Sequence, residues 1–217
     1  MWVDNGYIGN SQIKNGETMK KTIAIIAVTI VAELILLVIF VQSGLYNVST
    51  LSPDPGPLKW IFSTTSDNSV KHHAQAIVVP QEVKALSEGT ASNDSPSDSS
   101  MIAEGFDHYN DMCVTCHGAP GIDRSEAGQG LYPQPPDLVK SAKELPPQNL
   151  FWVIKNGVKS TGMPGFAKTH SDSKIWAMVA FLEKMKNMTP QDYAAMEKAN
   201  TSMGNMNMNM KMSHHEH

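Results

Sequence analysis

The stretch Cys113 to Gly121, CVTCHGAPG, contains both cysteines of the 217-residue chain, and His117 directly follows the second one. Two cysteines allow one disulfide at most, so they cannot form the disulfide framework of a small secreted domain. A Cys-x-x-Cys pair is typical of a redox dithiol, of half a zinc site or of a haem attachment site. The residues on either side of the pair must decide among these three.

The surrounding sequence argues against a redox dithiol and against zinc. A thioredoxin-like dithiol belongs to a βαβ unit, and residues 101–186 contain no convincing strand pattern. A zinc site needs two further ligands, which His108 and His170 would supply only if the fold happened to bring them to the thiols.

Haem attachment requires a helix that leads into the motif, and the preceding residues predict one. In the segment 101–112, Ile102, Phe106 and Tyr109 recur at three- and four-residue steps. Both thiols can then add to the haem vinyl groups as thioethers, because one turn of chain reaches both edges of the porphyrin. The adjacent His117 would lie under the iron as its proximal ligand.

With these features, residues 101–186 resemble a class I cytochrome c domain, of the kind found in cbb3-type oxidase subunits and small bacterial cytochromes. The segment 135–138, PPDL, resembles the family's Pro-Asn/Asp-Leu segment. The resemblance implies that the Pro136 carbonyl accepts a hydrogen bond from the proximal imidazole, with Leu138 beside the haem. Such a bond fixes the ring and raises its basicity.

Two further segments carry the resemblance. The segment 161–166, TGMPGF, resembles the axial methionine loop, which implies that Met163 is the distal ligand; His170 is the competing candidate. The segment 175–185, IWAMVAFLEKM, resembles the C-terminal helix, which in this family crosses the first helix where Gly105 and Phe181 would meet.

Trp152 has two interpretations. The default is a buried aromatic side chain in the haem wall. The resemblance also allows its ring nitrogen to bond a haem propionate.

The N-terminal part of the chain predicts a membrane anchor. Residues 22–41 read TIAIIAVTIVAELILLVIFV, with Glu33 as their single charge. About 20 apolar residues suffice to cross a bilayer. Lys20 and Lys21 precede the run, so residues 1–21 are expected in the cytoplasm, residues 22–42 in the membrane and the rest outside. A cleaved signal peptide is the alternative, although the run is long for one.

Between anchor and motif, two segments are expected. Residues 43–79 form a juxtamembrane segment with a helix at about 57–74, lying at the membrane surface or against a partner. Residues 80–100 are expected to be a flexible linker, because SEGTASNDSPSDSS (87–100) is too polar to bury a core. The haem domain would then occupy residues 101–186.

The C-terminal segment, residues 187–217, is rich in methionine and histidine. Its last 22 residues hold six of the 14 methionines and three of the eight histidines. Thioethers suit Cu(I) and imidazoles suit Cu(II), so copper binding by this tail is one hypothesis. A low-complexity tail that binds metal only weakly is the other.

The sequence therefore predicts a mainly α-helical protein: a single N-terminal transmembrane helix and a small all-α cytochrome c domain with one covalent haem c. Two occupied axial positions suit electron transfer and leave no substrate site, so we expect a carrier rather than an enzyme. It would act on the periplasmic side of a bacterial cytoplasmic membrane, with a quinol-oxidising complex, a periplasmic dehydrogenase or a terminal oxidase as partners. A net charge of −4 gives no footprint for nucleic acid.

Two alternative functions remain at this stage. One is a copper-binding accessory protein that acts through the tail. The other is a haem-based sensor or catalytic subunit in which Met163 leaves the iron.

Overall fold

The computed structural model describes residues 6–91 and 96–200. Their regular secondary structure is helical, apart from one isolated β-bridge between Ala119 and Ile122. The chain divides into two units, Met1–Ser52 and Pro53–His217, each of which is described by itself. The prediction of an all-α fold with one apolar N-terminal helix is confirmed.

The first unit consists of helix α1 (Gly6–Gln42) and a short exit segment. Within α1, Gly16–Gln42 is long and apolar enough to cross a membrane, with a mean hydropathy of 3.1 and none of its surface buried inside the structure. Two hydroxyls in this run have partners within the helix, because Thr22 and Thr29 each donate to the carbonyl four residues earlier. Such internal bonding lowers the cost of a polar side chain in lipid.

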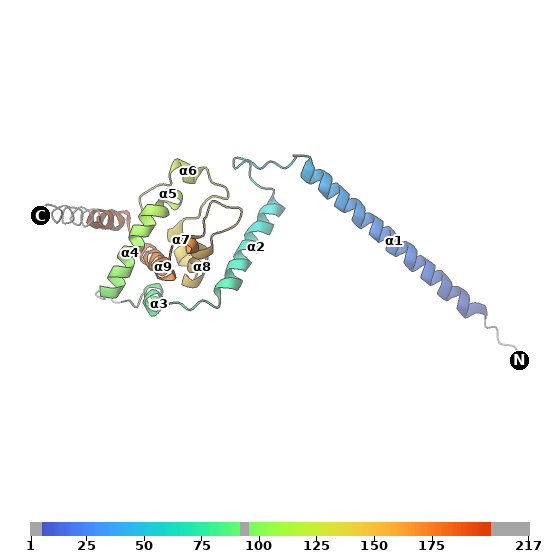
Figure 1. The fold of residues 1–217 in the computed structure, drawn as a ribbon, viewed down its shortest axis with the longest axis horizontal. Helices are drawn as coiled ribbons and strands as arrows, with labels where there is room; N and C mark the ends of the chain where they lie inside the picture. The colour runs from blue at the N-terminus through green and yellow to red at the C-terminus, as the bar shows by residue number, and fades with distance from the viewer. Residues whose placement is uncertain (1–5, 92–95, 201–217) are drawn as a thin grey trace. The chain divides into compact units, whose positions relative to one another are not determined.

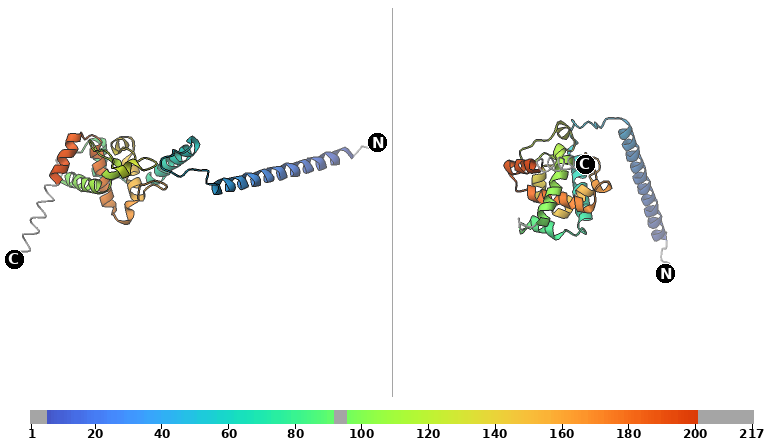
Figure 2. Two further views of the ribbon diagram at one scale, coloured as in Figure 1. Left: turned by 90° about the horizontal axis from the view of Figure 1, so that it is seen from above. Right: turned by 60° about the vertical axis from the view of Figure 1, so that its left-hand side comes forward.

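The second unit is built from short helices that surround one core (Figure 1). In chain order these are α2 (Gly56–Ala74), α3 (Gln81–Glu88), α4 (Pro96–Met112), α5 (Val114–His117), α6 (Glu126–Gln129), α7 (Leu138–Glu144), α8 (Pro147–Asn156), the 3-10 turn η1 (Phe166–Lys168) and α9 (Asp172–Met185). A further helical segment, residues 190–200, follows α9 and is the red helix of Figure 2.

The crossing of α4 and α9 organises this unit (Figure 1). At the crossing, a Cβ placed on Gly105 would lie 2.0 Å from the Ala177 carbonyl oxygen and 2.8 Å from the Phe181 Cβ. Only glycine lets the two backbones come this close. The predicted meeting of Gly105 with Phe181 is confirmed.

An aromatic cluster fills the core beside this crossing. Phe106 makes edge-to-face contacts with Phe181 at 5.3 Å and with Tyr193 at 5.5 Å between ring centroids. Tyr193 is buried and its hydroxyl donates to Asn110 Oδ1 at 2.5 Å. Because Tyr193 comes from residues 190–200, the segment predicted as a tail from residue 187 begins as part of the core. The sequence did not predict this burial, because Tyr193 is a single aromatic residue in a polar stretch.

Residues 80–100 differ from the predicted flexible linker. Residues 81–88 form α3, whose Val83 has no exposed surface, and α4 already begins at Pro96. Lys186, which directly follows α9, donates to the Ser87 carbonyl at 3.1 Å and so fastens the end of α3. The polar composition of this stretch predicted a linker because it gives no weight to single contacts. Burial of Val83 and the hydrogen bond to the Ser87 carbonyl together hold the helix in place.

Helix α2 lies close to its predicted range of 57–74, and its two halves differ. Val70 and Ala74 in its last turns are buried, and the His73 ring stacks on Trp152 of α8 at 5.8 Å. Trp60, Ile61 and Phe62 in its first turns are exposed. The second half is therefore packed into the folded unit, while the apolar side chains of the first half are exposed at its surface. Just before the helix, Asp54 N–H donates to the Tyr132 hydroxyl at 3.0 Å.

The crossing predicts a large effect of a single methyl group. Gly105→Ala should lower the free energy of unfolding by at least about 3 kcal/mol, because the new Cβ overlaps a main-chain carbonyl that cannot move aside. Gly130→Ala is the matched control, since its Cβ would meet nothing closer than 3.6 Å. Guanidinium denaturation followed by circular dichroism measures both. Equal stability of the two variants would contradict the crossing.

A buried ion pair on α9 predicts a pH-dependent effect. Lys186 Nζ lies 2.5 Å from Glu183 Oε2, and the Glu183 side chain has no exposed surface. Burial raises the pKa of Glu183, while Lys186 opposes that rise. Lys186→Gln would therefore raise this pKa further and should cost about 3 kcal/mol at neutral pH by leaving a buried carboxylate unpaired.

The sign follows from proton binding. A carboxyl with a folded pKa above its unfolded value loses its stabilising contribution as the pH rises through the folded pKa. The deficit of Lys186→Gln should therefore be small below about pH 4 and should grow towards neutral pH. Lys140→Gln, which breaks an exposed pair with Glu144, should cost less than about 1 kcal/mol at every pH. A pH-independent deficit in denaturant titrations would refute this role of Glu183.

Candidate functional site

The two cysteines lie on one helical turn at the end of α4. Cys113 precedes α5, and its carbonyl accepts from the N–H groups of Cys116 at 3.1 Å and of His117 at 2.9 Å. Both thiols are free and half-buried. Burial, and secondarily Cys116, raises the pKa of Cys113 to about 12, so this sulfur is a protonated thiol at neutral pH.

This environment does not favour zinc or thiolate chemistry. Thiol–disulfide exchange uses the thiolate, which a pKa near 12 opposes. Among residues 6–91 and 96–200, no group of three or more His, Cys, Asp or Glu side chains is arranged to hold a metal ion. His108 and His170 contact each other, with ring centroids 5.1 Å apart. They are therefore not brought together with the cysteines as a four-ligand set.

The imidazole of His117 has one nitrogen fixed by the main chain. Its Nδ1 lies 2.9 Å from the Pro136 carbonyl oxygen. A carbonyl only accepts, so Nδ1 carries the hydrogen and Nε2 retains a lone pair when the ring is neutral. Burial lowers the pKa of His117 and the charge of Arg124 adds to this, while the bond to Pro136 opposes it. The net effect favours the neutral ring, which is the form that binds metals.

A cavity of about 710 Å³ opens beside this imidazole. Its lining includes His117, Tyr109, Arg124, Leu138 and Val139. The Tyr109 hydroxyl donates to the Gly118 carbonyl at 2.5 Å, which closes the turn after the motif. Leu138 is the first residue of α7, whose N-terminus is capped by the Asp137 carboxylate.

Arg124 stands out in this cavity. Its Nε is buried and has no hydrogen-bond partner among residues 6–91 and 96–200. Buried donors are nearly always satisfied, and a guanidinium is best satisfied by a carboxylate or a phosphate. Sequence reasoning missed this residue, although Arg124 is the sole arginine of the chain and follows His117 by seven residues.

Met163 lies in a narrow loop between α8 and η1. The Met163 carbonyl accepts from Val158 N–H at 3.2 Å, and Gly157 (φ +68°) would place a Cβ 2.6 Å from Gly165 N. The Thr161 hydroxyl donates to the Val158 carbonyl at 2.7 Å and accepts from Met163 N–H at 3.0 Å. Met163 itself is half-buried and packs against the core.

A comparison with protein-family models identifies the class of domain to which this site belongs. The family described as "Cytochrome C oxidase, cbb3-type, subunit III" matches residues 100–182. Residues 100–182 are a class I c-type cytochrome domain. A search of curated proteins found no match to the chain.

The match settles the general function of this cytochrome domain. Domains of this kind carry electrons and hold haem c covalently. Together with the apolar helix Gly16–Gln42, the domain is consistent with a membrane-anchored electron carrier of a respiratory chain.

The structure brings some of the predicted site residues together. His117 and Leu138 line one cavity, and Pro136 bonds His117. Met163 is not among the residues that line this cavity. Its role as an axial ligand, like those of the other site residues, stays a prediction.

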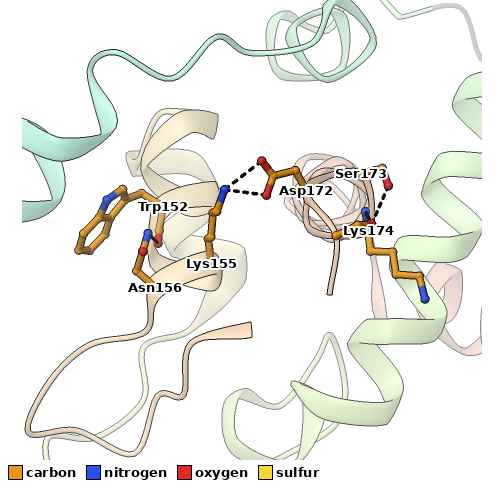
Figure 3. A network of polar contacts seen from close by, with 7 residues as sticks. Trp152, Lys155, Asn156, Asp172, Ser173 and Lys174 are labelled. Carbon is orange, nitrogen blue, oxygen red and sulfur yellow. Dashed lines mark hydrogen bonds and ion pairs between the residues drawn. The ribbon is translucent and has the colours of Figure 1, made fainter. Parts of the chain in front are cut away.

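Trp152 lies elsewhere in the cytochrome domain. It lines a separate cavity of about 440 Å³ between α2, α8 and α9. Figure 3 shows its α8 surroundings, where Asn156 Nδ2 donates to the Trp152 carbonyl at 2.9 Å and Lys155 pairs with Asp172 at 2.7 Å. Its ring stacks on His73. The prediction that Trp152 contacts haem stays open.

The remaining candidates lie outside the site. His170 directly precedes Ser171, which caps α9, and His170 is bonded to the Thr169 hydroxyl at 2.9 Å. The predicted copper-binding tail falls largely on residues 201–217, which lie outside the described part of the chain.

The Met163 loop predicts a role for a residue that sequence reasoning overlooked. Thr161→Val should speed the amide hydrogen exchange of Met163 about tenfold or more, because it removes the only acceptor that the structure gives this N–H and the bond to Val158. Thr161→Ser is the control, since it keeps the hydroxyl. Exchange measured by mass spectrometry on loop peptides separates the two. Similar exchange in both variants would rule out a positioning role for Thr161.

Proposed function

We propose that this chain is a membrane-anchored monohaem cytochrome that carries single electrons on the periplasmic side of a bacterial cytoplasmic membrane. Cys113 and Cys116 would hold one haem c through thioethers, with His117 and Met163 as axial ligands. The observation that carries the proposal is the bond from His117 Nδ1 to Pro136, which leaves Nε2 of a neutral imidazole as a lone-pair donor on the same helical turn as both thiols.

The residues of the site fit such a group in three respects. Two free thiols and a neutral imidazole lie on one helical turn, as covalent attachment and axial ligation require. Leu138, Val139 and Met188 supply apolar surface in the cavity next to them. The unpartnered Nε of Arg124 in the same cavity suits a haem carboxylate.

The protein's contribution would be orientation and burial. Pro136 fixes the plane and tautomer of His117, and this makes the imidazole a stronger donor. The double hydrogen bond of Thr161 holds the backbone of Met163 in one position. Bound haem supplies a one-electron Fe(III)/Fe(II) couple, and a thioether ligand favours the reduced state.

The order of the segments along the chain supports the proposed location. An anchor within residues 16–42 that carries Lys20 and Lys21 in its first turns supports a domain on the non-cytoplasmic side. Membrane attachment raises the effective concentration of the cytochrome domain near other membrane proteins. Partners would be a quinol-oxidising complex or a periplasmic dehydrogenase as donor, and a terminal oxidase as acceptor.

Mass spectrometry of the exported full chain tests the proposal. We expect a mass increment of one covalently bound haem, and its loss in Cys113→Ala/Cys116→Ala. The oxidised protein should show the weak far-red band of iron–sulfur ligation, which Met163→Leu should abolish while the covalent haem remains. A reversible one-electron reduction in an optical redox titration would complete the test.

Three results would contradict it. A chain without a haem increment would remove the function altogether, and an increment of two haems would remove the monohaem assignment. Rapid carbon monoxide binding by the reduced wild-type protein, without the far-red band, would favour a sensor or a catalytic subunit.

A further inference from the structure

The first two turns of α2 are apolar and uncovered. Trp60, Ile61 and Phe62 are 66%, 48% and 54% exposed, and they point to different sides of the helix, because successive residues are about 100° apart. From Ser63 onward the helix is mostly polar, and its buried residues are Val70 and Ala74. The apolar surface is therefore an end of the helix, which we call the apolar end (residues 57–62), and not a stripe along it.

The chain connects this apolar end to the membrane-spanning helix. Only 13 residues separate Gln42 from Gly56, and they span at most about 47 Å when fully extended. Residues 34–53 contain no charged side chain. The connection itself exposes Leu45, Val48 and Leu51. An uncharged apolar segment that leaves the bilayer is stabilised by staying at its surface, which keeps the apolar end near the lipid.

The backbone of the apolar end suits a partly dry environment. A helix normally begins with four N–H groups that lack an intrahelical partner. At the start of α2, Pro55 and Pro57 have no N–H, and Lys59 N–H already bonds the Pro55 carbonyl. Only Gly56 and Leu58 retain such donors. Burying this helix end therefore costs less than burying an ordinary one.

We infer that the apolar end of α2 inserts into the headgroup region of the lipid surface and thereby holds the cytochrome domain against the membrane. This inference rests on the membrane anchor in the proposed function. The charged side chains of Asp54, just before the apolar end, and of Lys59, within it, limit its depth to the headgroups. Trp60 suits this depth, because indole rings gather at membrane interfaces.

The other half of α2 converts insertion into orientation. It is fastened to the cytochrome domain by the stack of His73 on Trp152 and by burial of Val70 and Ala74. A helix attached at one end to the domain and at the other to lipid fixes the height of the domain above the bilayer. The connection between anchor and domain would then end near residue 53, because Asp54 N–H donates to the Tyr132 hydroxyl at 3.0 Å, and it replaces the linker predicted at 80–100.

Site-specific photocrosslinking tests this inference in the full-length holoprotein. p-Benzoylphenylalanine is placed at Trp60, at Ile61 or at Phe62, and the control site is Asn68, which is exposed in the polar half of the same helix. After irradiation of isolated membranes, mass spectrometry should find phospholipid adducts at all three apolar positions. The yield at each should exceed that at position 68 by about fivefold or more.

Each alternative outcome is distinguishable. Equal adduct yields at positions 61 and 68, or a crosslink from the apolar end to another polypeptide or a second copy, would overturn insertion into lipid. A chain recovered outside the membrane fraction would overturn it together with the anchor. Haem content and one-electron reduction of that same sample report separately on the electron-carrier proposal.

Discussion

The close approach of α4 and α9 at Gly105 is the constraint on which the second unit depends. Because a side chain there would overlap the Ala177 carbonyl, the two helices meet backbone to backbone, and Phe106 and Phe181 interlock beside them. Cys113 follows directly on the last residue of α4. The position of both thiols and of His117 is therefore set by a contact about two turns or more away, in the apolar core.

The site combines groups that are satisfied within the protein and groups that are not. His117 Nδ1, Met163 N–H and the Gly118 carbonyl all have internal partners, which fix side chains and loops in one arrangement. Arg124 Nε has none among the described residues, although it is buried. A preorganised site for an anionic cofactor needs side chains held in place and a hydrogen-bond donor that the cofactor can satisfy. The fixed groups and Arg124 Nε meet these two needs.

Much of the fold and of the site could be predicted from short motifs, because these encode local geometry. The helix before the cysteines, the crossing at Gly105 and the bond between His117 and Pro136 all followed from spacing or from resemblance. Arg124 and Thr161 were missed because their roles depend on hydrogen bonds across a loop, which no spacing rule describes. The ordering of α3 was missed because the prediction used the average polarity of residues 80–100, whereas burial of a single side chain, Val83, attaches this helix to the core.

The core of the cytochrome domain extends beyond the residues that the family model matches. The family match ends at residue 182, yet Val83 and Tyr193, which lie beyond it on either side, are both fully enclosed in the same core. A fragment cut at the borders of the match would lose both of these side chains. Sequence similarity is confined to residues 100–182, whereas the buried residues on either side show that the hydrophobic core is completed by a longer piece of polypeptide.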